Sequence, residues 1–178
     1  IAAHTSVVPL ETLYAWCRSA RDLLDERRVA RVIARPFVGE PGAYVRTYDR
    51  RDFSMEPPSA TVLDALVAGG VDVIGVGKIG DIYAGRGVPR CLHTEGNRDG
   101  MAAVRGLADE VDEGLVFANL VDFDMLWGHR RDPEGYAGGL ADFDEDLAAL
   151  EEGGLREGDL VILTGDHGND PTWKGTDH

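Results

Sequence analysis

Hydrophobic positions near the start of the chain recur with the spacing of an amphipathic helix. Between Pro9 and about Arg27 they are Leu10, Leu13, Tyr14, Cys17, Ala20, Leu23 and Leu24. This spacing places them on one face of a helix, and Pro9 suits its first turn. The next stretch, VARVIARPF, is short and rich in β-branched residues, which predicts a strand. Turn-forming residues then continue to Pro57 and Pro58, where we expect a domain boundary.

After these two prolines, helix-like and strand-like segments alternate. The helical patterns are residues 59–70, 99–114 and 141–154. The short apolar runs typical of buried strands are residues 71–76, 114–121 and 159–165. Such alternation predicts an α/β fold with a mainly parallel sheet flanked by helices. Functional groups of such sheets gather beyond the carboxyl ends of the strands, so we expect the chemistry just after the three apolar runs.

Composition and charge limit the classes of function. The chain has 178 residues, of which 43% are hydrophobic, and this is enough for a sizeable core. No apolar run approaches the roughly 18 residues that a membrane-spanning helix needs. A formal net charge of -14 opposes binding to the phosphate backbone of nucleic acids. We therefore expect a globular cytoplasmic protein without nucleic-acid or membrane partners, in which Cys17 and Cys91 are reduced thiols.

Side chains of the kind that bind metals are concentrated after two of the predicted strands. They are Asp124, His129, Asp166, His167 and His178. Taken singly, each suits a turn or a packing role, so it is their concentration that predicts a site. Mixed carboxylate and imidazole ligands favour a transition metal such as Mn²⁺ or Zn²⁺. Five ligands exceed the needs of one four-coordinate site with an open position, and they fit a two-metal site for phosphoryl transfer better.

The loop after the run 71–76 offers a second motif with a different meaning. Residues 75–80, GVGKIG, satisfy the glycine spacing of a dinucleotide-binding loop. Such a site needs a helix that opens at the loop, whereas the glycines and the proline of DIYAGRGVPR, residues 81–90, oppose a helix. We therefore exclude a nicotinamide or flavin site.

Four stretches spread over nearly the whole chain carry a family pattern. They are RVIARPFVGEPG, VGKIGDIYAGRG, LVDFDMLWGHRRDPEGY and VILTGDHGNDPTWKGTDH. Together they resemble the motifs of bacterial phosphopentomutases, which belong to the alkaline phosphatase superfamily. The GDHGN motif alone indicates only the superfamily, which includes cofactor-independent phosphoglycerate mutase. The resemblance implies that residues 59–178 form part of an alkaline phosphatase-like metal-binding core, and that residues 1–58 form part of a smaller α+β cap domain.

The resemblance also implies an activity and its cofactors. The activity is a phosphoryl shift between the 5-hydroxyl and the 1-hydroxyl of ribose or 2-deoxyribose, so a small sugar phosphate would be the partner. Two divalent metal ions, usually Mn²⁺, would stabilise the transferred group. In that scheme one metal is bound by Asp124, His129 and His178, and part of the other site comes from Asp166 and His167.

Three basic residues would contact the phosphate according to the same resemblance: Arg31, Arg46 and Lys78. Arginine forks match phosphate oxygens, and lysine acts as a point charge. Read without the resemblance, Arg31 and Arg46 suit solvated positions beside a strand. Lys78 is the better candidate, because it lies between glycines directly after a buried strand.

The family chain is longer than this one and supplies two further groups. They are a metal-binding aspartate and the threonine that carries the phosphoryl group, expected upstream, and neither can be placed here. We therefore expect this chain alone to be inactive. Two alternatives stay open: another enzyme of the superfamily, such as a phosphoglycerate mutase or a phosphatase, and a non-catalytic module that binds metal or sugar phosphate.

Overall fold

The computed structural model of the chain describes residues 1–174. The chain divides into two compact units, of which the first comprises Ile1–Thr61 and Asp81–Arg86. The second comprises Val62–Gly80 and the described residues from Gly87 onward. The boundary that we expect at residue 58, between a cap part and a core part, remains a prediction, because compactness does not tell which unit covers a substrate.

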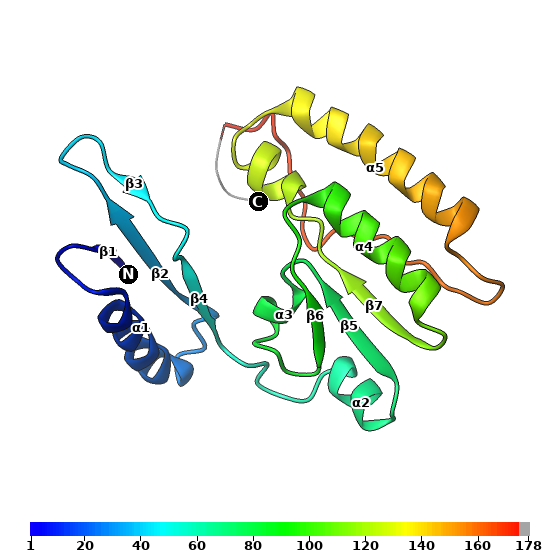
Figure 1. Cartoon of the computed structure of the whole chain (residues 1–178), viewed down its shortest axis with the longest axis horizontal. Helices are drawn as coiled ribbons and strands as arrows, with labels where there is room; N and C mark the ends of the chain where they lie inside the picture. Colours follow the sequence, from blue (N-terminus) through cyan, green and yellow to red (C-terminus); the bar gives the residue numbers. More distant parts are fainter. Residues whose placement is uncertain (175–178) are drawn as a thin grey trace. The chain divides into compact units, whose positions relative to one another are not determined.

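The first unit is a four-stranded sheet with one helix beside it (Figure 1). Its strands are β1 (Ala2–His4), β2 (Arg31–Val38), β3 (Val45–Arg46) and β4 (Arg51–Ser54), and its helix is α1 (Leu10–Asp25). Strand β2 pairs in parallel with β1 and antiparallel with β3 and β4. The structure thus contains the first predicted helix and strand. The stretch that we interpret as turns also contains two short strands, which are too brief for an alternating pattern to show.

Helix α1 buries its apolar face against one side of this sheet. The buried core consists of Ala3, Leu13, Cys17, Val32 and Ala34. Successive side chains of a strand point to opposite faces, so every second residue of β2 points toward α1. The residues in between, among them Arg31 and Arg35, point to the face that α1 does not cover.

The two cysteines differ in accessibility, which gives a testable difference in reactivity. Cys17 is 0% exposed, and burial raises the pKa of its thiol, so little reactive thiolate forms. Cys91 is half-buried, and neither residue is in a disulfide. We expect iodoacetamide at pH 8 to modify Cys91 at least about tenfold faster than Cys17 in the native protein. Mass spectrometry of tryptic peptides measures both rates, with protein in guanidinium as the control that labels both. Equal native rates would contradict the buried position of Cys17.

The elements after residue 61 form a three-stranded parallel sheet with helices on both faces. The strands are β5 (Asp72–Val76), β6 (Arg90–Leu92) and β7 (Gly114–Ala118), in the order β6-β5-β7. The helices are α2 (Val62–Ala68), α3 (Ile79–Ile82), α4 (Asn97–Glu110), the π-helix η1 (Phe123–Gly128) and α5 (Pro133–Gly153). Both strand pairs of this sheet are parallel, so the prediction of an α/β fold with a mainly parallel sheet is confirmed.

Strand β5 is buried on both faces because its two sets of side chains meet different helices. Ile74 and Val76 pack with Leu107 of α4. On the other face, a side chain at Gly75 would lie 2.8 Å from Val88 and 3.2 Å from Ile79, so the backbone there approaches its neighbours closely. Helix α4 packs against the sheet, at β5 and β7, and also against α5 (Figure 1). The loop with Lys78 follows the carboxyl end of β5, and the segment with Asp124 and His129 follows the carboxyl end of β7.

Helix α5 begins at Pro133, earlier than the predicted start at residue 141. Its N-cap is Asp132, whose carboxylate accepts a hydrogen bond from the Gly135 N–H at 2.9 Å. An N-cap aspartate followed by proline at N1 is a helix start signal. The several glycines that follow have low helix propensity and interrupt the apolar periodicity, so that periodicity does not show where the helix begins.

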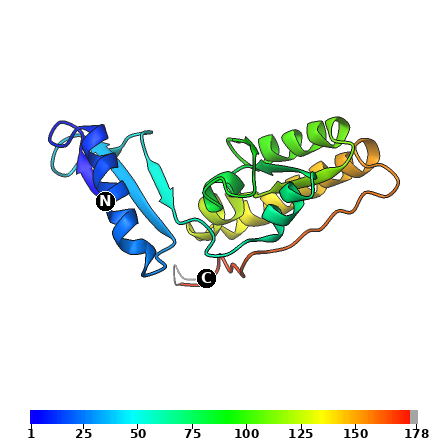
Figure 2. The ribbon, with the colours of Figure 1, turned by 90° about the horizontal axis from the view of Figure 1, so that it is seen from below.

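The predicted strand over residues 159–165 is wrong. The segment is extended, but it pairs with no described strand, and Leu160 is 83% exposed and Ile162 74% exposed. Figure 2 shows it as a ribbon without a strand arrow. Apolar composition favours a strand only where a neighbouring strand supplies hydrogen bonds, and the described residues offer this segment none.

None of the helices within residues 1–174 is long and apolar enough to cross a membrane.

Candidate metal centre

Asp124 lies on η1 and His129 is the C-cap residue of this π-helix, which follows the carboxyl end of β7. The His129 N–H donates to the Asp124 carbonyl oxygen at 2.9 Å, which is a bond between residues five apart. Such a bond defines a π-turn, a local geometry that is frequent at functional sites. It brings the two side chains together, with His129 Nε2 at 3.4 Å from Asp124 Oδ2. Both side chains are partly exposed, at 47% and 41%, so a ligand can reach them.

Asp166 and His167 form a second pair, on the segment that follows the extended residues 159–165. His167 Nε2 lies 3.7 Å from Asp166 Oδ2. His167 Nδ1 lies 2.9 Å from the Gly168 carbonyl oxygen, which can only accept, so Nδ1 carries the proton. This arrangement fixes the tautomer and leaves Nε2 as the nitrogen that can bind a metal.

Residues that flank the second pair contact η1 and the turn that follows it. A side chain at Gly128 would lie 2.0 Å from Asn169 Nδ2, so only glycine leaves room for Asn169 there. Arg131 Nη1 donates to the Lys174 carbonyl at 3.1 Å. The pKa of His167 is raised by its bond to Gly168 and then by the negative charges of Asp166 and Asp124. Asp124 is therefore close enough to His167 to influence it electrostatically.

The structure thus brings four of the five predicted ligands together as two pairs. No group of three or more His, Cys, Asp or Glu side chains within residues 1–174 is arranged to hold a metal ion. The fifth predicted ligand, His178, lies outside the described residues. Each pair offers one carboxylate oxygen and one imidazole nitrogen, and this donor set fits Mn²⁺ or Zn²⁺. The residues present therefore fit the implied metals as partial sites.

Lys78 lies directly beyond the carboxyl end of β5. The preceding Gly77 has a φ of +77°, and a side chain there would lie 2.6 Å from the Asn119 carbonyl oxygen. Only glycine fits this turn, which makes Lys78 the first side chain beyond the strand. Helix α3, which our reading of residues 81–90 does not predict, follows as a single turn and is too short for a dinucleotide site.

Arg31 and Arg46 share a face of the first sheet but lie near opposite ends of β2. Arg31 pairs in register with Ser54, whereas Arg46 pairs with Phe37. The six residue steps from Arg31 to Phe37 correspond to about 20 Å along a strand. The structure therefore does not bring the two arginines to one point. Arg31 Nη1 is 3.5 Å from Asp52 Oδ2.

Two glycines of α5 make room for the Trp127 side chain, a role that the apolar periodicity of this segment does not predict. A side chain at Gly139 would lie 2.2 Å from the Trp127 ring, and one at Gly135 would lie 2.4 Å from it. Trp127 thus packs against α5 and holds η1 there. The four-residue spacing of the two glycines on one helix face is the signal that could have revealed this groove.

Comparison with known proteins gives one family and several close relatives. A family model described as the metalloenzyme superfamily matches residues 45–178. A phosphopentomutase of Anaeromyxobacter sp. (strain K) is 63% identical over 178 residues, which is all of this chain and 46% of that protein. Phosphopentomutases of Deinococcus radiodurans and Dictyoglomus thermophilum are 57% and 52% identical over the whole chain, which covers 46% and 45% of those proteins.

The chain therefore spans about half the length of the curated relatives that it matches. The family model covers most of the chain, including both His–Asp pairs and Lys78. The α/β fold described above is consistent with the alkaline phosphatase-like core of this family. On this evidence, the chain belongs to the metalloenzyme superfamily.

Proposed function

We propose that this chain is part of a phosphopentomutase, which shifts a phosphoryl group between the 5-hydroxyl and the 1-hydroxyl of ribose or 2-deoxyribose. The observation that carries the proposal is the identity of 52% to 63% with phosphopentomutases over the whole chain. The two His–Asp pairs support it, because phosphoryl transfer depends mainly on positioning and charge neutralisation.

The metals in this proposal are two divalent ions, most simply Mn²⁺. Asp124, His129 and His178 would bind one, and Asp166 and His167 would contribute to the other. When bound, such ions neutralise the charge that develops on the transferred phosphoryl group. The chain's own contribution is to hold each imidazole beside its carboxylate, which η1 does for His129 and the bond to Gly168 does for His167.

Phosphate recognition in this proposal falls to the basic residues. Lys78 would place its ammonium beyond β5, where functional groups of parallel sheets gather. Arg31 and Arg46 would contact the substrate from the face of the first sheet that α1 does not cover. Because they lie near opposite ends of β2, we propose that they contact different parts of the substrate rather than one phosphate.

The nucleophile of the reaction has no counterpart that we can assign in this chain. The resemblance attributes it to a threonine, and a further metal-binding aspartate accompanies it. The proposal therefore concerns the complete gene product, with a small sugar phosphate as its substrate. We also propose a cytoplasmic location, which the two cysteines outside any disulfide support.

An activity assay on the complete gene product tests this proposal. With Mn²⁺ present, we expect conversion of ribose 1-phosphate to ribose 5-phosphate and no turnover of 3-phosphoglycerate. Turnover of 3-phosphoglycerate alone would instead assign a phosphoglycerate mutase. Release of inorganic phosphate without isomerisation would assign a phosphatase, and either result contradicts the proposal.

Replacing Lys78 tests the proposed phosphate contact. Lys78→Ala removes a charged hydrogen-bond donor, so we expect kcat/KM for ribose 1-phosphate to fall about 10- to 100-fold. Lys78→Arg should restore part of the loss, because it keeps the positive charge. Arg18→Ala, which removes an exposed cation on α1, is the control and should leave kcat/KM unchanged. An unchanged kcat/KM in Lys78→Ala would remove Lys78 from the binding site.

A further inference from the structure

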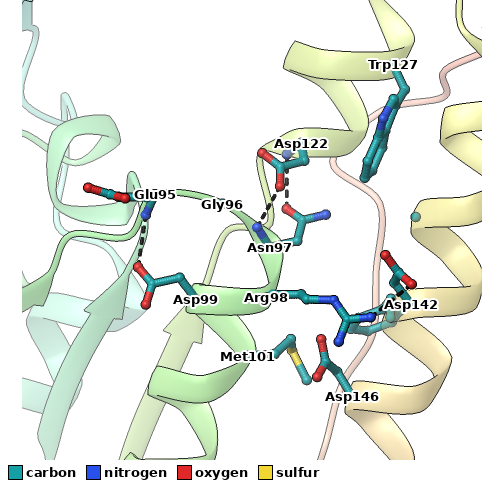
Figure 3. A pocket seen from close by; sticks show the side chains of 12 residues that line it. Glu95, Gly96, Asn97, Arg98, Asp99, Met101, Asp122, Trp127, Asp142 and Asp146 are labelled. Carbon is teal, nitrogen blue, oxygen red and sulfur yellow. Dashed lines mark hydrogen bonds and ion pairs between the residues drawn. The ribbon is translucent and has the colours of Figure 1, made fainter.

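Two buried polar residues exchange hydrogen bonds between the start of α4 and the start of η1. The Asn97 N–H donates to Asp122 Oδ2 at 2.7 Å, and the Asp122 N–H donates to Asn97 Oδ1 at 3.0 Å. Each residue is only 9% exposed. Figure 3 shows the two side chains pointing toward each other beside a small pocket. We refer to this pair of hydrogen bonds, together with Gly96, as the α4–η1 clamp.

The local sequence is built to accommodate this clamp. The N-cap of α4 is Gly96, which has no side chain to cap the helix, so the Asp122 carboxylate serves as the acceptor at this end of α4. A side chain at Gly96 would lie 2.8 Å from Asp122 Oδ2. A carboxylate is also favoured at a helix N-terminus by the helix dipole. Asp122 therefore interacts with the N-terminus of α4 both through a hydrogen bond and through the helix dipole.

The clamp holds Asp122, the residue that directly precedes the π-helix carrying the Asp124–His129 pair. Asp122 is the N-cap residue of η1, Asp124 lies within η1, and His129 is the C-cap residue that bonds back to Asp124. Because Asp122 directly precedes Phe123, the first residue of η1, hydrogen bonds that hold Asp122 also restrict the positions that the η1 backbone can take. We propose that Asn97 is a positioning residue for the Asp124–His129 pair, an inference that rests on the proposed function only through the metal.

Hydrogen exchange in the metal-free complete gene product tests the clamp itself. Asn97→Ala removes the acceptor for the Asp122 N–H and leaves the backbone of α4 intact. The N–H groups of Met125 and His129 close η1 by bonding Val121 and Asp124. We expect their exchange rates to rise about tenfold in the variant, as for local opening after loss of a buried hydrogen bond. Amides of β2 in the other unit are the internal control and should not change.

Metal affinity tests what the clamp does for the site. We expect the dissociation constant for Mn²⁺, measured by titration calorimetry, to rise about 10- to 100-fold in Asn97→Ala. Asp122→Ala should match it. Asp122→Asn keeps an acceptor for the Asn97 N–H and should retain most of the affinity. Arg98→Ala is the matched control on the same helix turn, because its ion pairs with Asp142 and Glu145 are exposed, and it should leave the affinity unchanged.

The outcomes separate this inference from the proposed function. Unchanged exchange of η1 in Asn97→Ala overturns the clamp. Faster exchange with unchanged Mn²⁺ affinity overturns the positioning role, as does an Asp122→Asn variant that loses as much affinity as Asp122→Ala. If the parent protein binds no Mn²⁺ while Asn97→Ala still accelerates exchange, the proposed function fails and the clamp stands as the determinant of η1 geometry.

Discussion

The Asp124→Ala variant of the complete gene product should bind Mn²⁺ at least about a hundredfold more weakly than the parent protein. Loss of residues that merely orient ligands already costs 10- to 100-fold, and Asp124 is itself a proposed ligand. Its partner His129 would keep its place in η1, because their backbone hydrogen bond does not depend on the side chain. Mutase activity should fall with metal affinity, since the charge on the phosphoryl group would no longer be neutralised.

Titration calorimetry with Mn²⁺ measures this effect, and an exposed aspartate provides the control. Asp112 is 96% exposed and pairs with Arg156, so Asp112→Ala should bind Mn²⁺ as the parent does. The melting temperature of Asp124→Ala should stay close to that of the parent when both are metal-free. Full Mn²⁺ affinity in Asp124→Ala would remove this residue from the metal centre.

Two adjacent glycines of α5 should respond in opposite directions to the same substitution. In Gly139→Ala the new methyl group would lie 2.2 Å from the Trp127 ring, and such overpacking typically destabilises a protein by about 1–3 kcal/mol. In Gly138→Ala the methyl group has nothing within 4 Å, so the gain in helix propensity should stabilise the protein by about 0.4–1 kcal/mol. Urea denaturation of both variants measures the free energies of unfolding.

The same pair of variants connects packing to the metal centre. Trp127 lies between Asp124 and His129 in η1, so displacing its ring in Gly139→Ala should also weaken Mn²⁺ binding. Gly138→Ala should bind Mn²⁺ as the parent does. If Gly139→Ala were as stable as Gly138→Ala, Trp127 would not occupy the groove on α5.

Local patterns in the sequence were sufficient for much of the fold. The amphipathic periodicity that ends near Arg27 corresponds to α1, and the apolar run 71–76 corresponds to β5. These elements depend on contacts that repeat every two to four residues, which a sequence displays directly. The three short strands β1, β3 and β6 span two or three residues each and are too brief for such a pattern.

The errors have a different physical origin. Residues 159–165 have the composition of a buried strand, but a strand also needs a neighbour, and composition does not report whether one is available. The late start assigned to α5 came from its glycines, whose role is to accept Trp127 rather than to end a helix.

In the candidate site, too, contacts between residues close in sequence could be predicted, whereas contacts between distant residues could not. The five-residue spacing of Asp124 and His129 was visible in the sequence, and the π-turn explains why that spacing brings them together. The bonds between Asn97 and Asp122 join positions 25 residues apart, so no local pattern could indicate them. Likewise, the opposite ends that Arg31 and Arg46 occupy on β2 follow from the strand register.

We propose that the two His–Asp pairs belong to a two-metal centre. Crystals of the complete gene product grown with Mn²⁺, with diffraction recorded at the manganese absorption edge, test it most directly. We expect two anomalous peaks, one beside Asp124 and His129 and the other beside Asp166 and His167, a few ångströms apart as in other two-metal sites. Peaks distant from both pairs, or no peak in crystals that contain Mn²⁺, would contradict the claim.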